Sequence, residues 1–172
     1  MQSVSKHTIF SKTIHTLSKY LIALAGLLIF APSTAQIGSR LPSEKKIVID
    51  SVTGAEMVFL TSKAGVKDSK IYQTHNQWTA DGQWIIFRSD RKNGEALAVN
   101  EETGEIVQVT EGGFMGYLLV ARKSMKLFVM RKANSSNDKD IVEIDLEKLF
   151  RDSKNSQVKG ESHYQKIVAT IP

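Results

Sequence analysis

The sequence predicts an all-β chain built from repeated four-stranded antiparallel units, and three observations support this. Residues 78–110 hold three short apolar bursts separated by turn formers, which is the pattern of strands joined into a meander. Two tight-turn pairs, Asp81-Gly82 and Asn93-Gly94, stand between the bursts. Parts of this pattern recur elsewhere in the chain. Because repeated four-stranded units of this length are the blades of a β-propeller, the expected architecture is a partial β-propeller.

Residues 1–35 are expected to be a secretory signal peptide that takes no part in the fold. Three lysines make this leader basic, no acidic residue precedes Glu44, and an apolar run covers residues 20–30. Cleavage is predicted after Ala35, which would export the protein to the periplasm. An uncleaved membrane anchor is the alternative, but the apolar run is only about half of the roughly 20 residues that a membrane-spanning helix needs. No stable membrane anchor is expected after cleavage.

The charge of the mature chain is close to balanced, which argues against a nucleic-acid partner. The whole sequence has 23 Lys and Arg against 18 Asp and Glu, and three of the lysines lie in the leader. The short basic cluster around Arg91 is typical of a solvated strand edge rather than of a nucleic-acid site. The chain has no cysteine, so neither a disulfide nor a lipid-modified cysteine is available.

The central unit is predicted to be a complete blade. Asp81-Gly82 favours a type I′ turn, because both central residues of that turn need positive φ and this pair tolerates it. Trp78 and Trp84 are predicted to pack within the blade rather than to stack on a sugar. The four strands are expected at residues 74–79, 84–87, 96–99 and 106–109.

Two internal similarities place further units on either side. The strand, turn and strand of residues 48–61 recur at residues 99–110, about fifty residues further on, with a Thr-Gly pair in each turn. Residues 126–131 (KLFVMR) resemble residues 83–88 (QWIIFR), 43 residues earlier. Both spacings agree with the roughly 40 to 50 residues of a four-stranded blade.

The repeats divide the mature chain into about two and a half blades. A helical segment at residues 146–154 interrupts the last unit before its final strand. Closed propellers usually have about four to eight blades, so the sequence is expected to be the N-terminal portion of a longer propeller, with a short open array as the alternative. The predicted parts are a linker at 36–44 and a propeller portion at 45–172, with blade parts at 45–61, 71–110 and 114–172.

The tract WTADGQWIIFRSDRKNGEA, residues 78–96, resembles the TolB-type propeller repeat. The matching features are the Asp-Gly turn, the apolar strand after it, and the Ser89-Asp90-Arg91 sequence followed by Gly94. This resemblance implies a WD40-like blade and no particular activity.

A narrower resemblance is to the opening blades of oligogalacturonate lyases. It rests on three segments that occur in the family's order, at residues 50–61, 71–87 and 99–118. The resemblance implies a seven-bladed propeller that cleaves digalacturonates by β-elimination in pectin catabolism. It also implies a Mn²⁺ ion held by His and Gln side chains of later blades. The catalytic and metal-binding residues are therefore expected beyond Pro172, and no metal ligand is predicted in this chain.

Four side chains are candidates for contacts with an oligogalacturonide or another uronate-containing oligosaccharide. His75 is expected on an innermost strand near the ligand mouth of the propeller, with Gln77 on the same face. Arg88 and Arg122 are candidate cations for a sugar carboxylate, since the guanidinium is a forked donor. The alternative interpretation is that all four are ordinary strand or surface residues.

Two functions from different classes follow from these resemblances. The first is the N-terminal part of an exported, periplasmic protein similar to oligogalacturonate lyases. The second is a non-catalytic TolB-like propeller that binds a protein or a glycan in the periplasm. The lyases that the sequence resembles work in the cytoplasm on imported fragments, whereas this leader predicts export. The two functions differ in whether later blades hold clustered His and Gln side chains.

Overall fold

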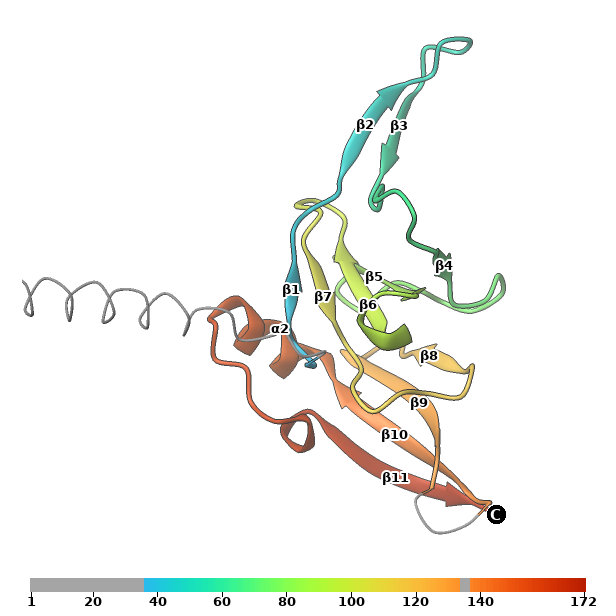
Figure 1. Cartoon of the computed structure of the whole chain (residues 1–172), viewed down its shortest axis with the longest axis vertical. Helices are drawn as coiled ribbons and strands as arrows, with labels where there is room; N and C mark the ends of the chain where they lie inside the picture. Colours follow the sequence, from blue (N-terminus) through green and yellow to red (C-terminus); the bar gives the residue numbers. More distant parts are fainter. Residues whose placement is uncertain (1–35, 134–136) are drawn as a thin grey trace, which may run out of the picture. The chain divides into compact units, whose positions relative to one another are not determined.

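The computed structural model describes residues 36–133 and 137–172. Within them lie three antiparallel sheets and one α-helix, which confirms the all-β prediction (Figure 1). The leader at residues 1–35 lies outside the described part, so the signal peptide stays a prediction. In the described part, no helix combines the length and apolar character needed to cross a membrane.

The central sheet has five antiparallel strands in the order β1-β7-β6-β5-β4. The strands are β1 (Arg40–Leu41), β4 (Asp68–Lys70), β5 (Trp84–Ser89), β6 (Ala96–Asn100) and β7 (Ile106–Gln108). Along β5, Ile86 joins the larger core, whereas Phe87 joins a second core on the opposite face. Because successive side chains of a strand point to opposite faces, the continuous apolar run of β5 supplies both cores.

The first strand of the predicted central blade lies earlier in the chain than expected. Instead of a strand at residues 74–79, β4 occupies Asp68–Lys70, and Trp78 makes a single bridge to Ile85. The side chain of Asn76 explains the break. Its Nδ2 donates to the Trp78 carbonyl oxygen at 2.6 Å, and its Oδ1 accepts from the Trp78 N–H at 3.3 Å. Such local bonds compete with the ladder of a sheet.

The type I′ prediction for Asp81-Gly82 is also wrong, because only Gly82 has a positive φ, at 70°. Asp81 instead closes the turn with its side chain. Its Oδ1 accepts from the Thr79 hydroxyl at 2.5 Å and from the Gln83 N–H at 3.1 Å. In the next turn, Asn93 and the glycine after it have φ of 61° and 80°, as a tight turn requires.

The second sheet has the order β11-β10-β9-β8 and occupies the last predicted unit. Its strands are β8 (Leu118–Val120), β9 (Lys126–Lys132), β10 (Lys139–Asp145) and β11 (Gln165–Ile171). Two short 3-10 helices, η1 (Lys92–Gly94) and η2 (Glu161–His163), lie in connecting loops.

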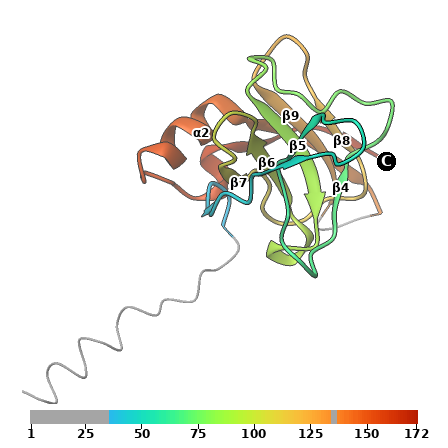
Figure 2. The same ribbon diagram turned by 90° about the horizontal axis from the view of Figure 1, so that it is seen from above.

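Between β10 and β11 stands α2, Leu146–Lys154, at the residues predicted to be helical. Asp145 is its N-cap, since its Oδ1 accepts from the Lys148 N–H at 3.1 Å. The helix lies beside the sheets (Figure 2). Its apolar side chains belong to the larger core, and Phe150 stacks on Trp84 with ring centroids 4.2 Å apart. Trp84 is therefore a packing residue, as predicted.

The third sheet is a hairpin of two strands, β2 (Lys46–Ile49) and β3 (Glu56–Phe59). Its turn repeats the β6–β7 turn, as the sequence predicts. Asp50 Oδ1 accepts from both the N–H and the hydroxyl of Thr53 at 2.7 Å, and Asn100 Oδ1 does the same with Thr103 at 2.9 and 3.1 Å. The glycine after each threonine has a φ of 72°. The two copies differ in burial, because β6 and β7 are buried while β2 and β3 are largely exposed.

Residues 36–44 are more ordered than the predicted linker. They contain β1, which pairs with β7, and Ile37 is completely buried in the larger core. The carbonyl of Gly38 accepts from the Ser153 hydroxyl at 2.7 Å. Gly38 has a φ of +81°, and a Cβ there would lie 3.0 Å from Val158, so this position favours glycine. The segment thus fastens the central sheet to α2.

Candidate functional site

His75 and Arg122, two of the four predicted site residues, line one hollow. It has a volume of about 450 Å³ and is lined by Thr74, His75, Asn76, Trp78, Thr79 and Arg122. These residues come from the loop that follows β4 and from the turn between β8 and β9. We call this hollow the His75–Arg122 pocket.

The loop that carries His75 is held at both ends and turned by its own backbone. Ile71 and Thr79 are 2% and 4% exposed, so both ends are anchored in the fold. The His75 N–H donates to the Tyr72 carbonyl oxygen at 3.1 Å, and the two rings lie 5.1 Å apart. With Asn76 closing the next turn, the loop presents its side chains from a fixed backbone.

Arg122 and Trp78 give the pocket its chemistry. Arg122 is exposed, and it makes no hydrogen bond or ion pair with any described residue. Trp78 is 39% exposed, so the prediction that it packs within the blade is wrong. None of the residues that line the pocket is acidic. A guanidinium beside an exposed indole is suited to a ligand that has both an anionic group and an apolar face.

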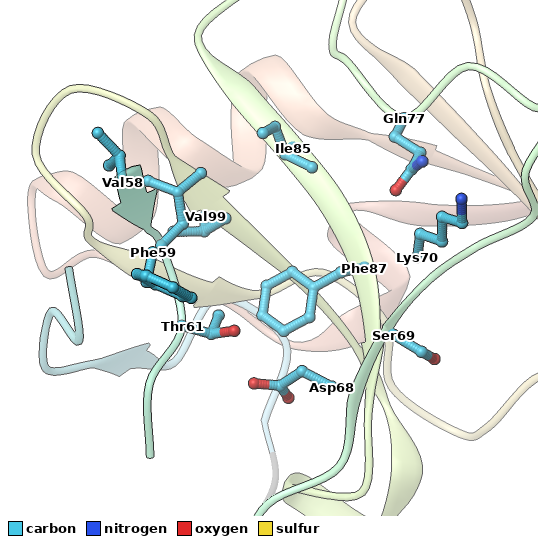
Figure 3. Close-up of a pocket in the computed structure, with 11 residues that line it drawn as sticks. Val58, Phe59, Thr61, Asp68, Ser69, Lys70, Gln77, Ile85, Phe87 and Val99 are labelled. Carbon is cyan, nitrogen blue, oxygen red and sulfur yellow. The ribbon is translucent and has the colours of Figure 1, made fainter. Parts of the chain in front are cut away.

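Gln77 does not share this pocket, so the predicted common face with His75 is wrong. Residues 71–77 are loop and lack the two-residue alternation of a strand. Gln77 lines a different hollow of about 350 Å³ between β3 and the central sheet. Figure 3 shows Lys70 and Gln77 on one side of it and Phe59 and Val99 on the other.

Arg88 lies apart from the pocket as well. Its Nη2 donates to the Gly116 carbonyl oxygen, which ties β5 to the loop before β8. Its Nε is buried without a hydrogen-bond partner among the described residues. Contact with substrate by Gln77 or Arg88 stays a prediction.

His163, the other histidine of the mature chain, belongs to a polar cluster beside α2. Its Nε2 lies 3.7 Å from Asp152 Oδ2, which also accepts from the Tyr164 hydroxyl at 3.2 Å. Burial raises the pKa of Tyr164 above its ordinary value. Burial works against the charge of Asp152, but the hydrogen bonds from Tyr164 and Arg151 outweigh it and lower the pKa of Asp152. This cluster joins α2 to the segment that leads into β11.

The described residues do not fit the Mn²⁺ ion that the sequence resemblance implies. Among residues 36–133 and 137–172, no group of three or more His, Cys, Asp or Glu side chains could hold a metal ion. In the His75–Arg122 pocket the histidine shares its space with a guanidinium, whose charge opposes a cation.

The five-stranded and four-stranded antiparallel sheets, with a turn geometry that recurs in the hairpin, are consistent with a partial β-propeller. Comparison with solved structures agrees. An oligogalacturonate lyase in complex with manganese matches with a TM-score of 0.58 and 19% identity, over 80% of this chain and 32% of that chain. The oligogalacturonate lyase from Vibrio parahaemolyticus matches with the same TM-score and identity, over 79% of this chain and 32% of that chain.

These matches confirm the predicted resemblance at the level of the fold. The chain spans about a third of the length of the lyases, since 32% of each is covered. No family model matches the sequence, and no curated protein matches it by sequence.

Proposed function

We propose that this chain forms the N-terminal blades of an exported protein of the oligogalacturonate lyase type. The main support for this proposal is the fold that the chain shares with a solved oligogalacturonate lyase, over 80% of the chain at 19% identity. The order of the three sequence segments that resemble the lyases supports the same assignment. The substrate would be an oligogalacturonide released during pectin breakdown.

The proposed reaction is a β-elimination. A base removes the proton from the sugar carbon next to the carboxylate, and the electron pair forms a carbon–carbon double bond as the bond to the leaving sugar oxygen breaks. The reaction requires a cation near the carboxylate, because the developing negative charge is spread onto that group. We assign the base and the metal ligands to blades beyond Pro172 and assign substrate contact and scaffolding to the residues described here.

Reading the encoding DNA downstream of the Pro172 codon is the first test. A reading frame that continues for several blades, with His and Gln at the ends of inner strands, is the expected result. The complete protein should then form an unsaturated uronate from digalacturonate, detected by ultraviolet absorbance, in a reaction that needs Mn²⁺. A stop codon directly after Pro172 would overturn the lyase proposal.

The alternative is a non-catalytic TolB-like propeller that binds a protein in the periplasm. The exposed hairpin favours it, because Ile47, Ile49 and Phe59 are 55%, 59% and 44% exposed. Exposed apolar patches of this kind are common at protein interfaces. Absence of turnover by the complete protein, with and without Mn²⁺, would favour this alternative.

The proposed export is tested separately. Expression of the full chain with its leader, followed by cell fractionation, should place the protein in the periplasm with Gln36 at its N-terminus. Mass spectrometry of the purified protein identifies that terminus. Recovery of a cytoplasmic protein that begins at Met1 would contradict export and leave the fold assignment unaffected.

A further inference from the structure

We propose that the His75–Arg122 pocket is a binding subsite for a uronate ring, with Arg122 on the carboxylate and Trp78 against the apolar face of the sugar. The proposal rests on the proposed function, because it names the part of the chain that contacts the substrate. It also stands as a binding site in its own right, whether or not the complete protein is a lyase.

The size of the pocket suits a sugar. Its volume is about 450 Å³, and small-molecule sites usually measure about 300 to 1,000 Å³. Two separate segments form its walls, since Trp78 and His75 come from the loop after β4 and Arg122 comes from the turn after β8. A ligand in the pocket would therefore contact loops that belong to two different sheets.

Arg122 differs from the other arginines of the described residues because its guanidinium has no bonding partner. The described residues contain six arginines, and the other five each have a partner. These pairs are Arg40 with Glu105, Arg88 with Gly116, Arg91 with Glu44, Arg131 with Gly113, and Arg151 with Asp152. Arg122 alone among them has all its donors free for a ligand. With no acidic side chain in the lining, an anionic ligand is favoured.

Trp78 is positioned in advance of binding. Its backbone is held by both polar atoms of the Asn76 side chain and by the bridge to Ile85. An exposed aromatic ring on a fixed backbone loses little conformational freedom when a ligand covers it. His75, whose ring rests against Tyr72, belongs to the same lining, and its imidazole can hydrogen-bond a sugar hydroxyl.

Tryptophan fluorescence gives a direct test. The chain has two tryptophans, and Trp84 is buried beneath Phe150, so a ligand in the pocket changes the emission of Trp78. Titration of the purified protein with digalacturonate should give a saturable change, and Trp78→Phe should abolish it. The neutral digalactose should bind at least about tenfold more weakly, because it lacks the carboxylate that a charge-assisted bond requires.

Variants in a single turn separate the subsite from general charge effects. Arg122→Gln should weaken digalacturonate binding by about tenfold or more, and Arg122→Lys should weaken it less. Lys123→Gln removes the same charge next to the pocket without altering its lining, so it should bind like the parent. Circular dichroism and thermal unfolding verify that each variant is folded. Isothermal titration calorimetry repeats the measurement without relying on Trp78.

Three results would overturn the subsite: equal weakening by Arg122→Gln and Lys123→Gln, equal affinity for the charged and neutral sugars, or no binding of digalacturonate. The lyase proposal can fail independently. Specific binding without turnover by the complete protein would leave the subsite standing. Turnover that is unchanged in kcat and KM by Arg122→Gln would remove the subsite and keep the lyase.

Discussion

Arg91 illustrates what the Ser-Asp-Arg sequence contributes to this fold. Its Nη1 and Nη2 donate to the two carboxylate oxygens of Glu44 at 2.7 and 3.1 Å, and Nη2 also contacts Asp68. The side chain of Arg91 is only 8% exposed. Glu44 in turn accepts from the N–H groups of Ser62 and Lys63 at 3.2 and 3.1 Å. One guanidinium therefore joins the segment before the hairpin, β4 and the turn after β5.

Arg91→Ala is expected to lower the free energy of unfolding by about 3 kcal/mol, because two largely buried carboxylates lose their cation. Arg91→Lys should restore only part of this loss, since an ammonium group cannot make the forked contact. Urea denaturation of the purified variants measures both effects. Arg151→Ala, at a side chain that is 59% exposed, is the matched control and should change the midpoint little. Equal losses for Arg91→Ala and Arg151→Ala would contradict the buried-pair account.

Because the same turn occurs twice, the loss of its side-chain hydrogen bonds can be compared in a buried and in an exposed position. Asn100 is 8% exposed, and Asn100→Ala removes two hydrogen bonds from Thr103, at an expected cost of about 1 to 2 kcal/mol. Asp50→Ala removes the equivalent bonds from the exposed hairpin, so it should leave the global midpoint almost unchanged. Urea denaturation and hydrogen exchange together measure this. If both variants lose the same stability, the hairpin unfolds together with the cores.

At the scale of the elements, Asp145 joins β9, β10 and α2. It ends β10, caps α2, and accepts from Lys126 Nζ of β9 at 2.8 Å. Burial works against its charge, but the bonds from Lys126 and from the Lys148 N–H outweigh it, so the pKa of Asp145 lies below 3.8. The same hydrogen bond raises the pKa of Lys126 above 10.5.

These directions set the pH dependence of stability. The contribution of Asp145 is complete above its unfolded pKa and is lost as the pH falls below about 4, whereas that of Lys126 is complete at neutral pH and is lost only above about 10.5. Asp145→Asn keeps an N-cap side chain but removes the charge, so its unfolding midpoint should fall less between pH 7 and pH 3 than the parent's. Urea titrations at both pH values test this. Glu102→Gln, at an exposed carboxylate, should retain the parental acid loss.

The predictability of an element depends on whether its signals are local. α2 is predictable because its cap and its apolar period lie within a few positions of one another. β4 is not, since Asp68–Lys70 contains no apolar residue and becomes a strand only by pairing with β5. The strand expected at residues 74–79 is replaced by a loop, where the side-chain bonds of Asn76 to the Trp78 backbone compete with sheet pairing.

At the scale of the whole molecule, the candidate site is less predictable than the fold. The sequence singles out His75 and Arg122 separately, yet their common pocket forms only when the loop after β4 meets the turn after β8. Arg88 has the same chemistry as Arg122, but tertiary packing turns it toward a carbonyl oxygen. The residue type indicates which contacts a side chain can make, and the fold determines which side chains are left free to make them with a ligand.

The hairpin of β2 and β3 lacks the strand partners and the burial that its equivalent strands have elsewhere in the described chain. β2 has no strand partner there other than β3, and apolar side chains of both strands are exposed. The repeat shows what is missing, because the equivalent β6 and β7 are buried beside β5 and β1. A free apolar edge is a template for pairing with another strand.

We therefore expect the purified protein to self-associate as its concentration rises, and Ile47→Lys to reduce this association, because an edge lysine opposes strand pairing. The unfolding midpoint should stay close to the parent's, since Ile47 is already 55% exposed. Sedimentation velocity over a range of concentrations measures the association. Val52→Lys, at a residue of the hairpin turn that is 91% exposed, adds the same charge away from the edge and should associate like the parent. Association that persists equally in Ile47→Lys would place the contact elsewhere and leave the edge of β2 without a role in it.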